Sequence, residues 1–193
     1  MPLNDLQIAA LAEGGMITPF FPRLIRKLNN HPAISFGLSS FGYDITLSPK
    51  EFRIFRRIPG EVVDPKAFTM DHLEWSTLQQ DSQGSFFILP AHSYALAVSL
   101  EHFKIPADVI AICLGKSTYA RTGVIVNVTP LEPGWTGHLT IEISNSSDSD
   151  VRVYANEGIA QLVFHRGTPP ATTYADRSGK YQGQQHQITL AKV

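Results

Sequence analysis

The sequence predicts a mainly β protein, a sandwich or barrel of antiparallel strands with a few short helices. Nine short strand-like runs follow one another between Tyr43 and Phe164, turn residues separate them, and no long helical pattern lies between them. The chain has 193 residues, which is enough to bury a core and is a typical length for one domain. We therefore expect residues 1–193 to form a single domain.

A short helix is expected at the N-terminus. Asn4 or Asp5 can act as its N-cap, and the glycines at 14–15 end it just after Glu13. A second short helix is expected around residues 21–28.

The predicted strands are short, β-like runs bounded by turn residues. They are Tyr43–Leu47, Phe52–Phe55, Phe86–Leu89, Tyr94–Leu100, Val109–Leu114, Gly123–Val128, His138–Ile143, Val151–Tyr154 and Ile159–Phe164. Polar residues predict a surface loop over Ser76–Ser85 and a tight turn over Asn145–Asp150. The segment Asp176–His186 is polar and has little strand pattern, so it either frays or folds over a ligand or a neighbouring subunit.

The overall composition argues against several classes of protein. The charges nearly balance, with 16 Lys and Arg against 17 Asp and Glu, so the basic surface that holds a nucleic-acid backbone is lacking. No stretch approaches the roughly 20 apolar residues of a membrane span, and the N-terminus lacks a signal-peptide pattern. The single cysteine, Cys113, lies in an apolar run and is expected to be a buried strand residue. Because one thiol cannot form an internal disulfide, we expect a cytoplasmic protein.

A zinc site is not predicted. The seven histidines are scattered without the paired spacing of metal ligands, and there is no second cysteine. Any water used as a reagent would therefore have to be activated by other groups.

The segment Gly115–Gly123 joins two apolar strands and carries two cations, Lys116 and Arg121, with several hydroxyl groups. Its first residues resemble the end of a P-loop, but Ile110 stands where that motif begins and a strand follows. The loop still suits a phosphate, because Lys supplies a point charge and Arg a planar fork. An ordinary polar turn with two solvated cations is the alternative.

The strand Gly137–Asn145 alternates apolar and polar residues. If its apolar residues face the core, Glu142 stands beside the hydroxyl groups of Thr140 and Ser144 on the other face. Glutamate is depleted in strands, so Glu142 is a candidate functional residue, although a solvated surface carboxylate is the alternative. The glycines and prolines just before this strand can bring backbone carbonyls close to a bound ring or water, whereas Trp135 is expected to anchor the core.

Six segments, in this order along the chain, together resemble the dCTP deaminase family, a branch of the trimeric dUTPase-like fold. They are Ser35–Asp44, Gly115–Arg121, Asn127–Trp135, Thr140–Glu142, Asn156–Gln161 and Gly179–Gln184. The resemblance covers almost the whole chain. It implies a distorted β-barrel or jelly roll of the dUTPase-like type and a homotrimer with three active sites at subunit interfaces. It also implies that residues 174–193 form a C-terminal tail closing over the site.

The resemblance implies zinc-independent deamination of dCTP to dUTP and ammonia, which supplies dUTP for dUMP and thymidylate synthesis. It assigns the catalytic role to Glu142, which would pass protons between the water, the ring nitrogen and the leaving amino group. Ser117, Arg121 and a backbone carbonyl near Thr129 or Pro130 would fix the water.

The resemblance also implies how the nucleotide is bound. The triphosphate is expected to arrive as its Mg²⁺ complex, with no metal ligand from protein side chains. The family further implies inhibition by dTTP. The implied substrate-binding residues are Lys116, Ser117, Thr118, Tyr119, Ala120, Arg121, Thr140, Ile141, Glu142, Gln161, Tyr174, Lys180 and Gln184.

Two other functions stay open on the sequence. The turn Leu131–Gly137 occupies the place where dUTPases carry a catalytic Asp, and Glu132 stands at that position. One alternative is therefore a dUTPase-like pyrophosphohydrolase, or a bifunctional deaminase that forms dUMP. The other is a non-catalytic nucleotide-binding regulator, against which the presence of both Glu142 and Arg121 argues.

Overall fold

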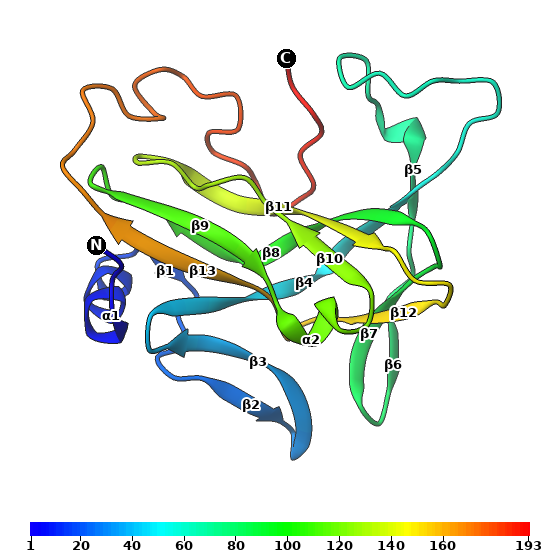
Figure 1. Cartoon of the computed structure of the whole chain (residues 1–193), viewed down its shortest axis with the longest axis horizontal. Helices are drawn as coiled ribbons and strands as arrows, with labels where there is room; N and C mark the ends of the chain where they lie inside the picture. Colours follow the sequence, from blue (N-terminus) through cyan, green and yellow to red (C-terminus); the bar gives the residue numbers. More distant parts are fainter.

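The computed structural model describes all 193 residues, and strands dominate it (Figure 1). In chain order its elements are α1 (Asp5–Glu13), β1 (Ile17–Thr18), β2 (Ile25–Leu28), β3 (His31–Ser39), β4 (Gly42–Phe55), η1 (Met70–His72), β5 (Leu73–Trp75), β6 (Gln79–Asp81), β7 (Gly84–Leu89), β8 (Tyr94–Lys104), β9 (Val109–Gly115), α2 (Ser117–Ala120), β10 (Val124–Asn127), β11 (Thr136–Asn145), β12 (Val151–Tyr154) and β13 (Gly158–Arg166).

The strands form two antiparallel sheets. The larger sheet has the order β10-β11-β8-β4-β13-β9, and the smaller sheet has the order β12-β7-β6. The larger sheet curls until its end strands meet, since a Cβ built on Gly115 of β9 would lie 3.4 Å from the carbonyl oxygen of Val126 in β10. The predicted mainly β fold, a distorted barrel with a few short helices, is confirmed.

Apolar side chains from both sheets fill one large core. Its largest fully buried side chains come from β4, β7, β8 and β13 and are Tyr43, Phe52, Phe87, Phe103 and Phe164. The expected N-terminal helix is present, with a capping box in which the Gln7 N–H donates to Asn4 over 3.0 Å. No helix is long and apolar enough to cross a membrane.

The helix expected around residues 21–28 is wrong. Residues 25–28 form β2, which pairs with β3. Between these strands Asn29 and Asn30 both have positive φ, 48° and 68°. Two consecutive residues with positive φ make the tight turn that a hairpin prefers, and this turn directs the chain back as a second strand.

Every other predicted element requires only local revision. The runs expected at 43–47 and 52–55 are parts of one strand, β4, which has an irregular register between them. The loop expected over 76–85 is wrong in part, because its polar residues include β6 and the start of β7. Trp135 is buried in the core as expected, and Cys113 on β9 is half-buried.

A buried carboxyl group joins two irregular strands beneath β11. The register of β8 is irregular around residues 97–99 against β4 and around residues 98–102 against β11. Glu101 lies within this irregular stretch with no exposed surface, and it accepts hydrogen bonds from the Thr46 N–H (3.0 Å) and hydroxyl (2.9 Å). Burial raises the pKa of Glu101 from 4.5 to about 7. The protonated form therefore suits this position best.

We expect Glu101→Gln to change how stability depends on pH. Because the native pKa is raised, the stability that protonated Glu101 contributes is complete below about pH 4.5 and is lost as the pH rises through about 7. A neutral amide avoids this loss. The free energy of unfolding of the variant, relative to wild type, should increase by about 2 to 3 kcal/mol between roughly pH 5 and pH 8. Urea denaturation at both pH values measures it, and parallel pH curves for the two proteins would contradict the buried-acid interpretation.

Candidate active site

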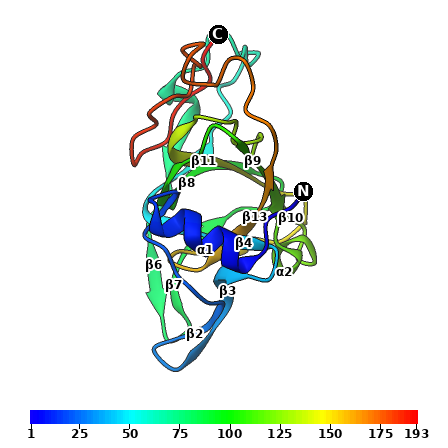
Figure 2. The ribbon, with the colours of Figure 1, turned by 90° about the vertical axis from the view of Figure 1, so that its left-hand side faces the viewer.

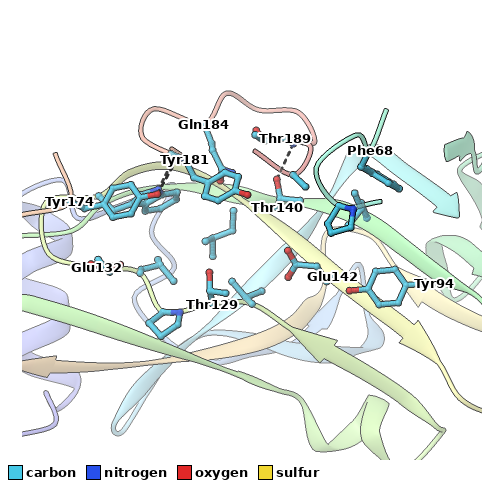
Figure 3. A pocket seen from close by; sticks show the side chains of 18 of the residues that line it. Phe68, Tyr94, Thr129, Glu132, Thr140, Glu142, Tyr174, Tyr181, Gln184 and Thr189 are labelled. Atoms are coloured by element: carbon cyan, nitrogen blue, oxygen red, sulfur yellow. Dashed lines mark hydrogen bonds between the residues drawn. The ribbon is translucent and has the colours of Figure 1, made fainter. Parts of the chain in front are cut away.

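A cavity of about 770 Å³ contains the side chain of Glu142 on one face of the large sheet (Figure 3). We call it the Glu142 cavity. Its walls come from β8, β11, the segment 128–135, residues around 55–68 and the C-terminal segment 174–191. The polar side chains around it belong to Tyr94, Thr129, Glu132, Thr140, Glu142, Tyr174, Tyr181, Gln184 and Thr189.

Glu142 lies in the middle of β11, paired with Leu96 of β8 and Asn127 of β10. As the alternation predicts, its neighbours Ile141 and Ile143 are fully buried in the core. The Oε2 atom of Glu142 is buried and has no hydrogen-bond partner within the chain. Burial raises the pKa of this carboxyl group to about 7. It can therefore both lose and regain a proton near neutral pH.

The C-terminal segment crosses the wall of this cavity and is hydrogen-bonded to it. The Trp135 Nε1–H donates to the carbonyl of Tyr181 over 2.8 Å, and the Tyr181 N–H donates to the Tyr174 hydroxyl over 3.0 Å. Further along, the Thr189 N–H donates to the Thr140 hydroxyl over 3.0 Å. Residues 174–189 thus lie directly against β11 and the segment before it.

Glycine at position 137 allows the close approach of this segment. The His138 N–H donates to the Gln184 carbonyl over 2.9 Å, and a Cβ on Gly137 would lie 2.7 Å from the Gln184 backbone nitrogen. Two residues beyond Gln184, the ring of His186 stacks on His138 with centroids 4.3 Å apart. Any larger residue at 137 would displace the segment.

A carboxylate at the rim also contacts the C-terminal segment. Glu132 lines the cavity and forms an ion pair with Arg177. Both side chains are substantially exposed, so the pair is worth little stability by itself. The ion pair does engage the Glu132 carboxylate, which is therefore not free to act on a ligand.

The phosphate-loop candidates lie elsewhere in the chain. Lys116 is largely buried and donates to Asp44 over 2.5 Å and to Ser35 over 3.2 Å. Gln161 also donates to Asp44, over 3.1 Å. We call these four residues the Asp44 cluster. Its two donors are directed at a carboxylate of the same chain.

The short helix α2 presents most of the remaining loop candidates. Ser117, Thr118, Ala120 and Arg121 are exposed. Tyr119 is buried instead, and its hydroxyl accepts the Tyr154 N–H over 2.8 Å. Arg121 is therefore the cation of this loop that is accessible to a ligand.

Two groups of candidates are thus separated within one chain. The Glu142 cavity gathers Thr140, Glu142, Tyr174 and Gln184, but none of residues 115–121 nor Gln161 lines it. Figures 1 and 2 show the C-terminal segment above the barrel and α2 toward its lower side, away from that segment. Ile141 lies in the core, and Lys180 is exposed outside the cavity, its carbonyl accepting the Lys192 ammonium over 3.1 Å.

Several lining residues were not among the candidates from sequence. Tyr94 begins a predicted strand and shares a sheet face with Glu142, but this follows only once β8 is known to pair with β11. Tyr181 lies within the Gly179–Gln184 motif and could have been found there. Phe68 comes from a segment without any strand or helix pattern, so no sequence signal pointed to it.

No group of three or more His, Cys, Asp or Glu side chains is arranged to hold a metal ion. The Glu142 cavity contains two carboxylates, Glu132 and Glu142, and no histidine. Hydroxyl groups, one amide and these two carboxylates are the polar side chains that a ligand would meet there.

Comparison with known proteins identifies many relatives. The dCTP deaminase-like family model matches residues 3–167. The curated dCTP deaminase of Nitrosococcus oceani is 52% identical over 98% of this chain and 98% of its own length. That of Erythrobacter litoralis is 52% identical over 99% of this chain and 98% of its own length.

A solved structure has a similar fold. The crystal structure of 2′-deoxycytidine 5′-triphosphate deaminase from Agrobacterium tumefaciens matches 86% of this chain, with a TM-score of 0.58 and 20% identity. The present chain covers 48% of that longer chain. At this level of identity the similarity concerns the fold.

We expect Trp135→Phe to loosen the C-terminal segment, because it removes the donor to the Tyr181 carbonyl. Loss of about 1 kcal/mol corresponds to roughly fivefold more frequent opening. Amide hydrogen exchange should become faster by this factor in residues 174–186. Trp75→Phe is the matched control, because Trp75 is 61% exposed on β5 and stacks on Arg53 instead. Unchanged exchange in residues 174–186 of Trp135→Phe would show that this bond does not hold the segment.

Proposed function

The chain belongs to the dCTP deaminase-like family, and on this premise we propose that it hydrolyses dCTP to dUTP and ammonia. The observation that carries the mechanism is the buried carboxyl group of Glu142, whose pKa is raised to about 7. The cavity around it, about 770 Å³, is within the size range of small-molecule sites. The dUTP formed would be available for dUMP and thymidylate synthesis.

The reaction replaces the amino group at C4 of cytosine by oxygen. Glu142 takes one proton from water as the oxygen bonds to C4, and passes this proton to ring nitrogen N3. It then transfers the remaining hydroxyl proton to the amino group, the C4–N bond breaks, and ammonia leaves. A carboxyl group with a pKa near neutral pH suits both directions of transfer, because neither protonation state is strongly favoured.

We infer that each complete site lies between two chains of a homotrimer. Within one chain the exposed Ser117 and Arg121 do not line the Glu142 cavity. The neighbouring end strands expose large apolar side chains, with Leu114 of β9 52% exposed and Ile125 of β10 57% exposed. Apolar surface of this kind suits a subunit contact. A neighbour would then supply the loop that the cavity lacks.

In this assembly the water would be held from both chains. Ser117 and Arg121 of one chain would face the backbone carbonyls of Thr129 or Pro130 in the other, and both of these residues line the Glu142 cavity. Thr140 would contact the base from the same wall as Glu142. Gln161 would act from the neighbouring chain, through the Asp44 cluster.

The triphosphate would be held by the α2 loop and the C-terminal tail. Arg121 is the exposed cation, whereas Lys116 would have to share its ammonium between Asp44 and phosphate. Thr118, Lys180 and Gln184 would complete this contact. A magnesium ion carried by the phosphate oxygens and water would require no carboxylate cage from the protein. Such an ion would shield the phosphate charge.

We propose that residues 1–193 act as one domain whose tail, residues 174–193, closes over the bound nucleotide. The hydrogen bonds from Trp135 and to Thr140 support this role, because they hold the tail at the cavity wall. Inhibition by dTTP and a cytoplasmic location stay predictions.

Pyrophosphate release through Glu132 is the second candidate. This carboxylate lines the cavity, which favours it, but its pairing with Arg177 competes with activation of a water. The pair instead supports a role for Glu132 in holding the tail.

We expect Glu142→Gln to reduce dCTP turnover by about 10²- to 10⁴-fold, because the amide cannot accept and return a proton. Ammonia release and nucleotide chromatography measure it. Glu132→Gln is the matched control and should still form dUTP. Wild-type turnover by Glu142→Gln would refute the assigned role. A dUMP and pyrophosphate product lost in Glu132→Gln would favour the second candidate, and binding without product would favour a regulator.

We expect two inactive variants to restore each other when mixed. If Glu142 and Arg121 of one site come from different chains, unfolding and refolding Glu142→Gln with Arg121→Ala yields some sites with both native residues. For random mixing at equal amounts, about a quarter of wild-type activity should return. A mixture as inactive as the separate variants would show that the two residues act from the same chain.

A further inference from the structure

We propose that the hydroxyl group of Tyr94 holds the carboxyl group of Glu142 in its working orientation, which makes Tyr94 a positioning residue. This inference rests on the role proposed above for Glu142. It adds a residue outside the six segments that carry the family resemblance.

Strand pairing brings the two side chains together. In the antiparallel ladder of β8 and β11, Tyr94 pairs with Ser144 and Leu96 pairs with Glu142. Side chains two residues apart share a face, so Tyr94 is the diagonal neighbour of Glu142, within reach of a long aromatic side chain. Both side chains line the Glu142 cavity, and Figure 3 shows the phenol oxygen on the side of the Glu142 carboxyl group, with no hydrogen bond between them. The bond proposed here therefore forms when the carboxyl group of Glu142 turns toward the phenol.

The tyrosine ring is held by a small apolar cluster. Phe55 meets it edge to face, with ring centroids 4.9 Å apart. The ring also packs against buried Leu73, Leu96 and Ile188, the last of which belongs to the tail. Packing from these segments restricts the ring, and with it the position of the phenol oxygen.

Glu142 needs a donor, and the cavity offers few. Its Oε2 atom is buried without a partner, and a buried carboxylate oxygen in that state is costly. No Lys, Arg or His side chain lines the cavity. The other titratable groups there are Glu132, Tyr174 and Tyr181. Outside the cavity lining, burial and next the charge of Glu142 raise the pKa of Cys113 on β9. Within one chain, hydroxyl groups are therefore the donors within reach.

The phenol stays available as a donor at neutral pH. Burial, and next the charge of Glu142, raise the pKa of Tyr94 above its ordinary value. When the hydroxyl donates to one carboxylate oxygen, the other oxygen is left to face the reacting water. The donated bond also favours the ionised carboxylate, so it lowers the pKa of Glu142 relative to an enzyme without it.

The first test is Tyr94→Phe, which keeps the ring and removes only the hydroxyl. We expect the acid limb of the kcat profile against pH to move up by about half to one pH unit, because Glu142 loses a bond to its charged form. The KM for dCTP should stay unchanged. Tyr154→Phe is the matched control, since it removes a phenol hydroxyl on β12 outside the Glu142 cavity, and its profile should not move. Coincident profiles for Tyr94→Phe and wild type would overturn the proposal.

The second test measures the interaction between Tyr94 and Glu142 without following dCTP turnover. Absorbance titration of the six tyrosines should show one phenol whose pKa falls in Glu142→Gln, because the neighbouring negative charge is gone. The same change should be absent when Glu142→Gln is made in the Tyr94→Phe background. Unaltered phenol titration in Glu142→Gln would overturn the coupling. If that variant instead retained dCTP turnover, the proposed role of Glu142 would fail while this titration still reported on the pair.

Discussion

The antiparallel pairing of β11 between β8 and β10 is the constraint on which the rest of the site depends. It sends alternate residues of one strand to two environments, so that Ile141 and Ile143 are buried in the core while Glu142 faces the cavity. A carboxyl group fixed on such a strand cannot swing out to water as it could from a loop. Partial burial with one unpartnered oxygen follows, and the raised pKa of Glu142 is its chemical consequence.

The same strand also serves as the platform for the C-terminal tail. The Gln184 backbone packs closely against Gly137, and its carbonyl accepts the His138 N–H. The Thr140 hydroxyl accepts the Thr189 N–H. Because these contacts lie within five residues of Glu142, closure of the tail and orientation of the carboxyl group are physically linked. Ile188 strengthens the link, since it packs in the apolar cluster that holds the ring of Tyr94.

A buried ion pair organises the other group of candidates. Lys116 and Asp44 are 10% and 6% exposed, and such a pair contributes little net stability because both charges lose their hydration. Its value lies in position, because it holds the end of β9 against β4 and directs α2 outward. Arg121 is consequently left exposed just after α2, and α2 lies away from the tail in Figure 2. A site assembled from two chains would reconcile this exposure with the incomplete cavity.

The sequence alone determined the fold class and the polar face of the strand that carries Glu142. Turn residues and apolar runs were sufficient to predict the mainly β fold, and the alternation around Glu142 predicted which face of its strand is polar, because both signals depend on near neighbours in sequence. The errors at 21–28 and 76–85 arose where polar or mixed segments become strands only by pairing with distant partners. Tertiary structure alone decided that Tyr94 and the tail meet Glu142, that Lys116 is engaged by Asp44, and that Gln161 lies apart from the cavity. Strand order and register set these contacts, and both result from packing the whole sheet rather than from any one segment.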